Sequence, residues 1–174
     1  MKTFVVLMLL SCLALAQDDA AIAKAKAACG PDDTKFEVKN SASPPPATPE
    51  NGKALVYVIN LATQADSCIH CGNTARVGMD GAWAGATHGN SYLTLNVAPG
   101  EHHLCTKLQS LFASVSRYVA LANFTAEAGK VYYFRMRGIV TQTEAFLDLD
   151  PVNTDQGQYL VATSKMAESH PKKP

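Results

Sequence analysis

Apolar residues alternate with small or polar residues along positions 76–107, and two turn signals interrupt this alternation. Asp80-Gly81 is a favoured two-residue hairpin turn, because both central positions need a positive φ. Residues 98–101 (APGE) suit a type II turn, in which Pro fixes φ at the second position and Gly accepts a positive φ at the third. The pattern predicts two consecutive antiparallel hairpins at the centre of an all-β domain.

Further short strands are predicted on both sides of these hairpins. Residues 54–60 form a nearly continuous β-branched and aromatic run, which is typical of a central strand buried on both faces. We expect another hairpin around Ala128-Gly129, a brief strand over residues 36–38, and a strand over residues 144–150 that Pro151 ends. About seven short strands without alternating helices predict a mostly β chain, folded as an antiparallel β-sandwich or a partly open barrel.

Two helices are predicted at the ends of the chain. An alanine-rich run between Asp19 and Gly30-Pro31 favours a short N-terminal helix, because acidic residues suit a helix start and Gly-Pro suits its end. A closing helix is expected over residues 156–166, capped by Thr154 or Asp155. The chain then divides into a signal peptide (1–16), an N-terminal helix with a short strand (17–39), a proline-rich linker (40–53), a sandwich domain (54–167) and a frayed tail (168–174).

The first sixteen residues have the pattern of a secretory signal: one lysine, a short apolar core and small residues before an Ala-Leu-Ala site. Cleavage after Ala16 would make Gln17 the mature start. Residues 9–12 (LLSC) also resemble a bacterial lipobox, in which Cys12 would be the lipidated N-terminus. We therefore expect an exported chain that is periplasmic, secreted or associated with the outer membrane.

Charge narrows the choice of partners. Fifteen basic and fifteen acidic side chains cancel, so the chain offers no electrostatic footprint for nucleic acid or for an anionic membrane surface. No other stretch approaches the roughly 18 apolar residues of a membrane span. We expect no nucleic-acid partner and no transmembrane span in the mature chain.

The register of the Asp80-Gly81 hairpin predicts where its side chains point. Residues opposite each other share a face, so Val77, Met79, Ala82 and Ala84 would form the inward set. Trp83 would lie on the other face, over Gly78 and near Arg76, where an aromatic platform can stack on a sugar ring or a peptide. The alternative is that the N-terminal extension or a loop covers Trp83. We predict a contact surface made of Trp83, Arg76, Tyr92 and His88.

The second hairpin would pair Val97 with His102, Leu95 with Leu104 and Leu93 with Thr106 on the core side. Its outer face would carry Tyr92, Thr94, Asn96, His103, Cys105 and Lys107. Four cysteines remain after signal removal, and an even count in an oxidising compartment indicates two disulfides. Because Cys105 points outward, our hypothesis pairs Cys105 with Cys29 and leaves Cys68 to pair with Cys71.

The segment Cys68-Ile-His-Cys71 lacks the His after the second Cys that a c-type haem needs, and lacks the following helix of a thioredoxin site. A structural disulfide is the favoured interpretation, and a metal site using Cys68, His70 and Cys71 is the alternative.

Two further polar patterns favour structural roles. His102 and His103 would point to opposite faces of a strand, so they cannot easily share a metal, and His103 would join a polar cluster with Asn96 and Thr94. Asp148 and Asp150 share the spacing of Arg135 and Arg137, which favours a cross-strand ion-pair ladder over a glycosidase or calcium site.

Several motifs together resemble the domain-of-unknown-function 2846 family of bacterial exported proteins, over roughly residues 52–167. The resemblance rests on residues 29–31 (CGP), 52–58 (GKALVYV), 76–83 (RVGMDGAW), 90–92 (NSY), 99–105 (PGEHHLC), 128–135 (AGKVYYFR) and 164–165 (SK). A shorter match is similar to PEGA-type surface modules. The resemblance implies export and an Ig-like or PEGA-like sandwich, and it implies no known activity or catalytic residues.

The sequence thus predicts an exported, non-enzymatic binding module without a cofactor, whose partner is cell-wall polysaccharide or an envelope protein. A metal-handling protein built on Cys68, His70, Cys71 and His88 is the second hypothesis. A hydrolase is the third hypothesis. It would need a cleft that joins Asp148 or Asp150 to a histidine, and nothing in the sequence demands such a cleft.

Overall fold

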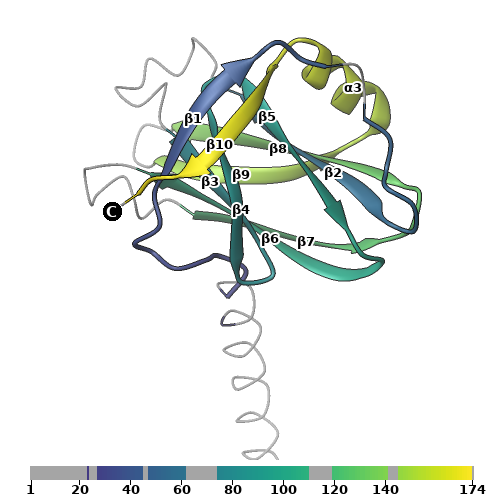
Figure 1. The fold of residues 1–174 in the computed structure, drawn as a ribbon, viewed down its shortest axis with the longest axis horizontal. Coiled ribbons are helices and arrows are strands. Elements are labelled where there is room, and N and C mark those ends of the chain that lie inside the picture. Colours follow the sequence, from purple (N-terminus) through teal and green to yellow (C-terminus); the bar gives the residue numbers. More distant parts are fainter. Residues whose placement is uncertain are drawn as a thin grey trace, which may run out of the picture.

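The computed structural model describes residues 23, 27–44, 47–61, 74–109, 119–140 and 145–173, and these residues form two packed β-sheets with one helix (Figure 1). The predicted signal peptide, with Cys12, and the loop with Cys68, His70 and Cys71 lie outside them. Of the predicted N-terminal helix, the structure describes Ala23, which is helical and accepts a hydrogen bond from Ala27 N (2.9 Å), and residues 27–29, which form a turn instead of helix.

One sheet has six strands in the order β1-β10-β5-β2-β8-β9, and the other has four in the order β4-β3-β6-β7. The six-stranded sheet contains β1 (Phe36–Ser41), β2 (Ala54–Leu61), β5 (Ser91–Val97), β8 (Val131–Val140), β9 (Ala145–Val152) and β10 (Lys165–Pro171). The four-stranded sheet contains β3 (Thr74–Met79), β4 (Ala82–His88), β6 (Gly100–Gln109) and β7 (Val119–Ala126). The prediction of a mostly β, two-sheet chain is confirmed.

The six-stranded sheet is mixed, whereas the sequence predicted antiparallel pairing throughout. β2 pairs in parallel with β8, and β10 pairs in parallel with β5. The starts of β2 and β8 lie together, since Gly129 N donates to Lys53 O (2.8 Å) and Leu55 N donates to Lys130 O (3.0 Å). After β2 the chain crosses to the other sheet, returns as β5 antiparallel to β2, and crosses again as β6 and β7. It then re-enters as β8 beside the start of β2, and this route makes the β2–β8 pair parallel.

Two of the predicted hairpins are wrong for the same reason. β5 and β6, on either side of Pro99-Gly100, belong to different sheets, and so do β7 and β8, on either side of Ala128-Gly129. β5 pairs with β2 instead, with Val97 opposite Ala54 and Leu95 opposite Val56. Turn chemistry predicts that the chain reverses, but a reversal can also carry it from one sheet to the facing one.

The predicted buried and exposed faces of β5 and β6 are correct even though the two strands do not pair. Val97 and Leu104 are both buried between the sheets, and Leu93 and Leu95 pack against the same cluster. Apolar residues of both sheets point into the space between them. The period-2 pattern therefore predicts which side of a strand is buried, but not which strand lies beside it.

The Asp80-Gly81 hairpin is confirmed, with one change of register. Met79 lies opposite Ala82 and Gly78 opposite Trp83, and the turn residues have φ of 52° and 91°. A bulge between Val77 and Gly78 then places Val77 opposite Gly85 rather than Ala84. Ala82 and Ala84 are both exposed, so the predicted inward set keeps only Val77 and Met79.

Strand β2 contributes to two apolar clusters. Val56 and Val58 lie between the sheets, whereas Leu55, Tyr57 and Ile59 lie on the outer face of the six-stranded sheet beneath the helix α3 (Thr154–Ala162). This double role explains its continuous apolar run, and the predicted central strand is confirmed.

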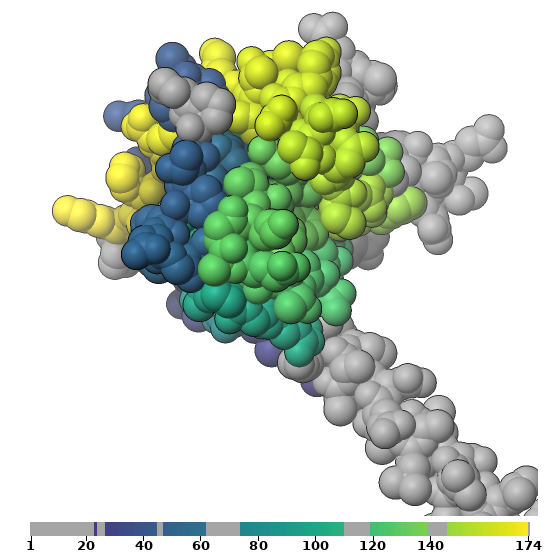
Figure 2. Space-filling view, turned by 90° about the vertical axis from the view of Figure 1, so that its right-hand side faces the viewer, coloured from purple at the N-terminus to yellow at the C-terminus, as the bar shows by residue number. Residues whose placement is uncertain are grey.

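The C-terminal region differs from its prediction. α3 ends at Ala162 instead of residue 166, and its N-cap is Asn153, whose side chain accepts from Gln156 N (2.9 Å), not Thr154 or Asp155. Residues 165–171 form β10, which pairs with the whole of β1, although the sequence predicted a frayed tail over residues 168–174. Figure 2 shows these last residues (yellow) packed beside the blue N-terminal part of the chain. None of the described helices is long and apolar enough to cross a membrane.

Candidate functional site

The outer face of the four-stranded sheet is covered by a segment that precedes β1. We call residues 27–41, which include β1, the N-terminal arm. Its residues Cys29, Asp32 and Phe36 contact Cys105, Lys107 and Gln109 in turn, so the arm follows β6 in the same direction. Because side chains two positions apart in a strand share a face, one side of β6 supplies all three contacts.

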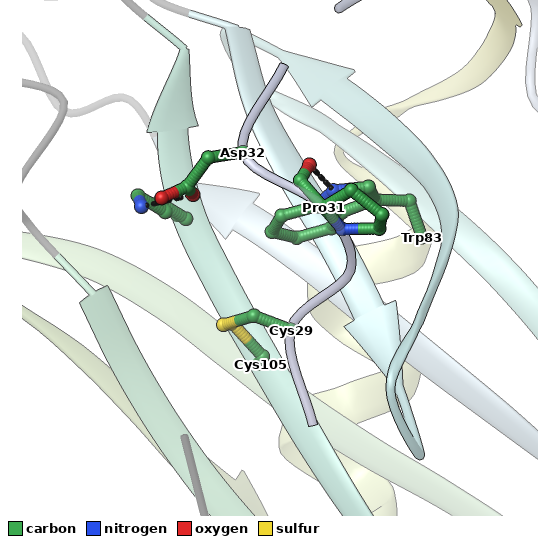
Figure 3. Close-up of a disulfide and its surroundings, with 6 residues drawn as sticks. Cys29, Pro31, Asp32, Trp83 and Cys105 are labelled. Carbon is green, nitrogen blue, oxygen red and sulfur yellow. Dashed lines mark hydrogen bonds and ion pairs between the residues drawn. A yellow bond between two sulfur atoms is a disulfide. The ribbon is translucent and has the colours of Figure 1, made fainter. Parts of the chain in front are cut away.

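The disulfide Cys29–Cys105 attaches this arm to the sheet, with the two Cα atoms 5.2 Å apart (Figure 3). This bond confirms the predicted pairing. Gly78, the neighbour of Cys105 on β3, makes room for the arm, since a Cβ there would lie 2.9 Å from Ala28 O. Gly81 N also donates to Ala28 O (3.2 Å). The sheet is thus shaped to receive the arm at this point.

Trp83 lies on the predicted face, and the arm covers it (Figure 3). Its indole Nε1 donates to Pro31 O (2.6 Å). A Cβ at Gly30 would lie 2.4 Å from ring carbon Cδ1 of Trp83, so the backbone of the arm passes directly against the indole. Of the two interpretations of Trp83, the geometry agrees with coverage by the N-terminal extension, which leaves the residue half-buried.

Arg76 is only 4% exposed and binds the arm through main-chain oxygens. Its Nη1 donates to Asp32 O (3.0 Å) and to Thr34 O (2.9 Å), and its guanidinium carbon lies 4.5 Å from the Trp83 ring centroid. Burial lowers the pKa of Arg76, and the Asp32 carboxylate opposes that effect. The side chain stays cationic, because a guanidinium does not lose its proton in proteins, and it stacks on Trp83 as a cation–π pair.

Two polar side chains that the sequence did not single out complete the contact. Lys107 forms an ion pair with the Asp32 carboxylate, and this interaction lowers the pKa of Asp32. Gln109 uses both ends of its amide on Phe36, accepting from N (2.7 Å) and donating to O (2.9 Å). The signal for both was the period-2 spacing from Cys105, which places them on the same face of β6.

The other two predicted contact residues lie elsewhere. Tyr92 is 2% exposed on the outer face of the six-stranded sheet, where its ring packs on Tyr57 and its hydroxyl lies 2.5 Å from Ser43 Oγ. His88 ends β4, with Nδ1 3.3 Å from Thr74 Oγ1. The structure brings Trp83 and Arg76 together and separates both from Tyr92, because β5 lies in the other sheet.

Asp80 connects the β3–β4 turn to β6. Its carboxylate accepts from His103 N (2.9 Å) and lies 2.6 Å from His102 Nδ1, while His102 Nε2 lies 2.7 Å from Ala98 O. Burial of the ring lowers the pKa of His102, but its hydrogen bonds to Asp80 and Ala98 O outweigh burial and raise it. Burial likewise raises the pKa of Asp80, yet the bonds from His103 N and His102 bring it below its ordinary value.

The predicted cluster of His103 with Asn96 and Thr94 is wrong. The His103 ring lies 3.4 Å from a Glu101 carboxylate oxygen, and Asn96 instead bonds to Glu50 in the segment before β2. Because β5 and β6 do not pair, the residues cannot meet.

The ion-pair ladder is confirmed. Arg135 lies opposite Asp150 and Arg137 opposite Asp148, with nitrogen–oxygen distances of 3.3 Å and 3.0 Å, and Arg137 also contacts Asp150 at 3.0 Å. Among the described residues no group of three or more His, Cys, Asp or Glu side chains is arranged to hold a metal.

These features define a class: a β-sandwich with a mixed six-stranded sheet, a four-stranded sheet and a disulfide-bonded N-terminal arm. The family model described as "Protein of unknown function (DUF2846)" matches residues 50–147, more than half of the chain, and the chain belongs to this family. The match includes Arg76, Trp83 and Cys105, whereas Cys29 and the arm precede it. The likeness to PEGA-type modules stays a prediction. Neither curated proteins nor solved structures gave a match.

Proposed function

We propose that this chain is an exported, non-enzymatic interaction module of the cell envelope: periplasmic, secreted or held at the outer membrane. The observation that carries the proposal is the Cys29–Cys105 disulfide, which joins residues 76 positions apart. Disulfides persist in oxidising compartments and are rare where thiols are kept reduced. The signal-like first sixteen residues agree with this address.

The structural role of the charged side chains supports the proposal that the module is non-enzymatic. Asp80 pairs with His102, Asp32 with Lys107, and Asp148 and Asp150 with two arginines. Each of these carboxylates bonds to a basic side chain and links one element to another, which is the arrangement of structural ion pairs.

The intact mass of the protein from its native host tests the address. We expect a chain that starts at Gln17 and is lighter by four hydrogens, which corresponds to Cys29–Cys105 together with Cys68–Cys71. A diacylglycerol mass on Cys12 would place the chain on a membrane and keep it exported. An unprocessed chain with free thiols in the cytoplasmic fraction would refute the proposal.

The contact surface we propose is the part of Trp83 that the arm leaves exposed, with Arg76, itself buried, stacked on the indole ring. A tryptophan fixed by an arginine on one side and by the arm on the other is a rigid, partly exposed aromatic, and such residues dominate binding energy at interfaces. Its partner would be cell-wall polysaccharide or an envelope protein.

Trp83→Ala and Trp83→Phe test this surface by co-sedimentation with isolated cell wall and by pull-down from envelope extracts. We expect Trp83→Ala to lose binding, and Trp83→Phe to retain part of it because the ring remains. Tyr159→Ala is the matched control, since Tyr159 is 64% exposed on α3 at the other sheet. Equal binding by Trp83→Ala and the wild type, both folded by circular dichroism, would refute the assignment.

A further inference from the structure

The geometry points to an exchange of N-terminal arms between two copies of this chain. The face beneath the arm would then be a docking site for residues 27–41 of a second copy, with Cys29 of one chain bonded to Cys105 of the other. The inference needs the oxidising compartment of the proposed function, and it is independent of any envelope ligand.

The arm is held by contacts that a second copy supplies equally well. The sheet binds four main-chain oxygens of the arm: Gly81 N binds Ala28 O, Trp83 binds Pro31 O, and Arg76 binds Asp32 O and Thr34 O. Gln109 adds a pair of bonds to Phe36. None of these contacts depends on how the arm is connected to β2.

Three positions make the site selective for this arm. Gly30 leaves no room for a Cβ, which would lie 2.4 Å from Trp83. Cys29 meets Cys105, and the Asp32 carboxylate meets Lys107. An occupant must therefore carry a cysteine, then a glycine, then an acidic residue two positions later. Residues 29–32 of a second copy have that pattern by identity, which is why we name a second copy as the partner.

The arm can also separate from its own domain. β1 is the edge strand of the six-stranded sheet and pairs only with β10, so its departure opens no interior ladder. Within β1 only Phe36 is buried. Residues 42–53 join the arm to β2 and, where described, form no helix or strand. Twelve residues span up to about 40 Å when extended, which is long enough to reach a neighbouring molecule.

Exchange between identical chains with the same contacts creates closed dimers at little cost. The protein concentration decides whether the arm docks on its own chain or on a second copy. A connection of twelve residues keeps the arm at an effective concentration of roughly millimolar at its own sheet, so the intrachain form dominates in micromolar solution. Exchange competes at millimolar concentrations or among crowded copies, and the disulfide then locks whichever state has formed.

A complementary pair of variants tests the exchange directly. Cys29→Ser retains Cys105, and Cys105→Ser retains Cys29, so neither forms the bond alone. We would mix the folded proteins in a buffer of reduced and oxidised glutathione. Oxidised glutathione takes the two electrons and two protons of the thiols and leaves as two reduced molecules. We expect a covalent heterodimer whose peptide map joins Cys29 to Cys105.

Specificity is tested by adding Gly30→Val to the Cys105→Ser copy, since a side chain there collides with Trp83. We expect the heterodimer to fall severalfold. Wild-type protein, reduced and reoxidised between about 10 μM and 1 mM, should give covalent dimer in rising proportion. A missing heterodimer, equal yield with Gly30→Val, bonds at Cys68 or Cys71 instead, or purely monomeric wild type at 1 mM would each refute the exchange. The host mass measurement is unaffected by these outcomes, so failure here is distinct from failure of the proposed function.

Discussion

At Gly157 the helix α3 touches the ring of Tyr133, and a Cβ at this position would lie 2.2 Å from the ring carbon Cγ. Tyr133 in turn stacks on Tyr57, with ring centroids 5.1 Å apart and planes inclined by 15°. Single atoms therefore decide how closely α3 approaches the sheet.

Gly157→Ala should destabilise the protein by about 1–3 kcal/mol, as overpacked positions do. The sign of this stability change is diagnostic, because at an open helix position alanine is favoured over glycine by about 1 kcal/mol. Urea unfolding measures the difference. Gln156→Ala, at an exposed position of the same helix, is the control and should change stability by less than about 0.5 kcal/mol. A stabilising Gly157→Ala would contradict the packing of α3 on Tyr133.

The Asp80–His102 pair makes stability depend on pH. Both ring nitrogens of His102 face acceptors, so the protonated ring is satisfied on both sides. The pKa of His102 is raised above 6.5 in the folded protein. Its contribution to folding stability is therefore fully present below the pKa of the unfolded state and is lost as the pH rises through the pKa of the folded state. The pKa of Asp80 is lowered, so its contribution is present above 3.8 and is lost as pH falls through its folded value.

We therefore expect the wild type to be more stable at pH 5.5 than at pH 8.5, relative to Asp80→Asn, by less than about 1 kcal/mol. The effect is small because solvent screens a half-exposed pair. Asn keeps the turn, since Asn-Gly accepts the positive φ of 52° at position 80. Urea unfolding at both pH values gives the difference, and parallel pH curves for the two proteins would contradict the assignment.

At the scale of elements, the start of α3 shows why the N-cap was predicted one or two residues too late in the sequence. Thr154 and Asp155 are both acceptable caps by residue type, but Asn153 has the extended backbone (φ −67°, ψ 167°) that a cap requires. Sequence pattern alone ranks several candidates in a run of Asn, Thr and Asp, and the backbone selects among them.

Asn153→Ala should cost about 0.5–2 kcal/mol, the usual loss for a missing N-cap. Thr154→Ala is the matched control and should have a smaller effect, because Thr154 lies inside the helix. Thermal and urea unfolding measure both variants. If Thr154→Ala were the more damaging of the two, the cap would lie where the sequence pattern first placed it.

At the scale of the whole molecule, the disulfide closes a loop of 76 positions between the arm and β6. Chain-entropy arguments give such a bond about 4 kcal/mol of stability, between the values for shorter and longer loops. Removing it also releases the first part of the arm, residues 27–34, whose remaining polar contacts include side-chain hydrogen bonds to its main-chain oxygens and the ion pair of Asp32 with Lys107.

Trp83 is the only tryptophan of the chain and reports this release. Cys29→Ser should lower the free energy of unfolding by about 4 kcal/mol, and its tryptophan emission should shift to longer wavelength because water reaches the indole. Circular dichroism should show the strands retained. An unshifted emission spectrum in the variant would mean that the arm stays docked without the bond.

The sequence by itself determined most of the strands, most of their faces and the turns. Alternation of period 2 is a property of each segment alone, so the inward positions of Val97 and Leu104, the outward position of Cys105 and the Arg–Asp ladder were all predictable. The coverage of Trp83 by the arm was one of two predicted alternatives.

Only the tertiary structure decided which strands pair. Ladder hydrogen bonds join main-chain groups that every residue carries, so Pro99-Gly100 gives no sign of whether β6 returns to β5 or crosses to the other sheet. For the same reason the sequence did not predict β10, whose partners lie more than a hundred residues away in β1 and 74 residues away in β5. Nor did it predict the separation of Tyr92 from Trp83. The arm's path over Arg76, Lys107 and Gln109 emerges from non-local packing, which local pattern does not contain.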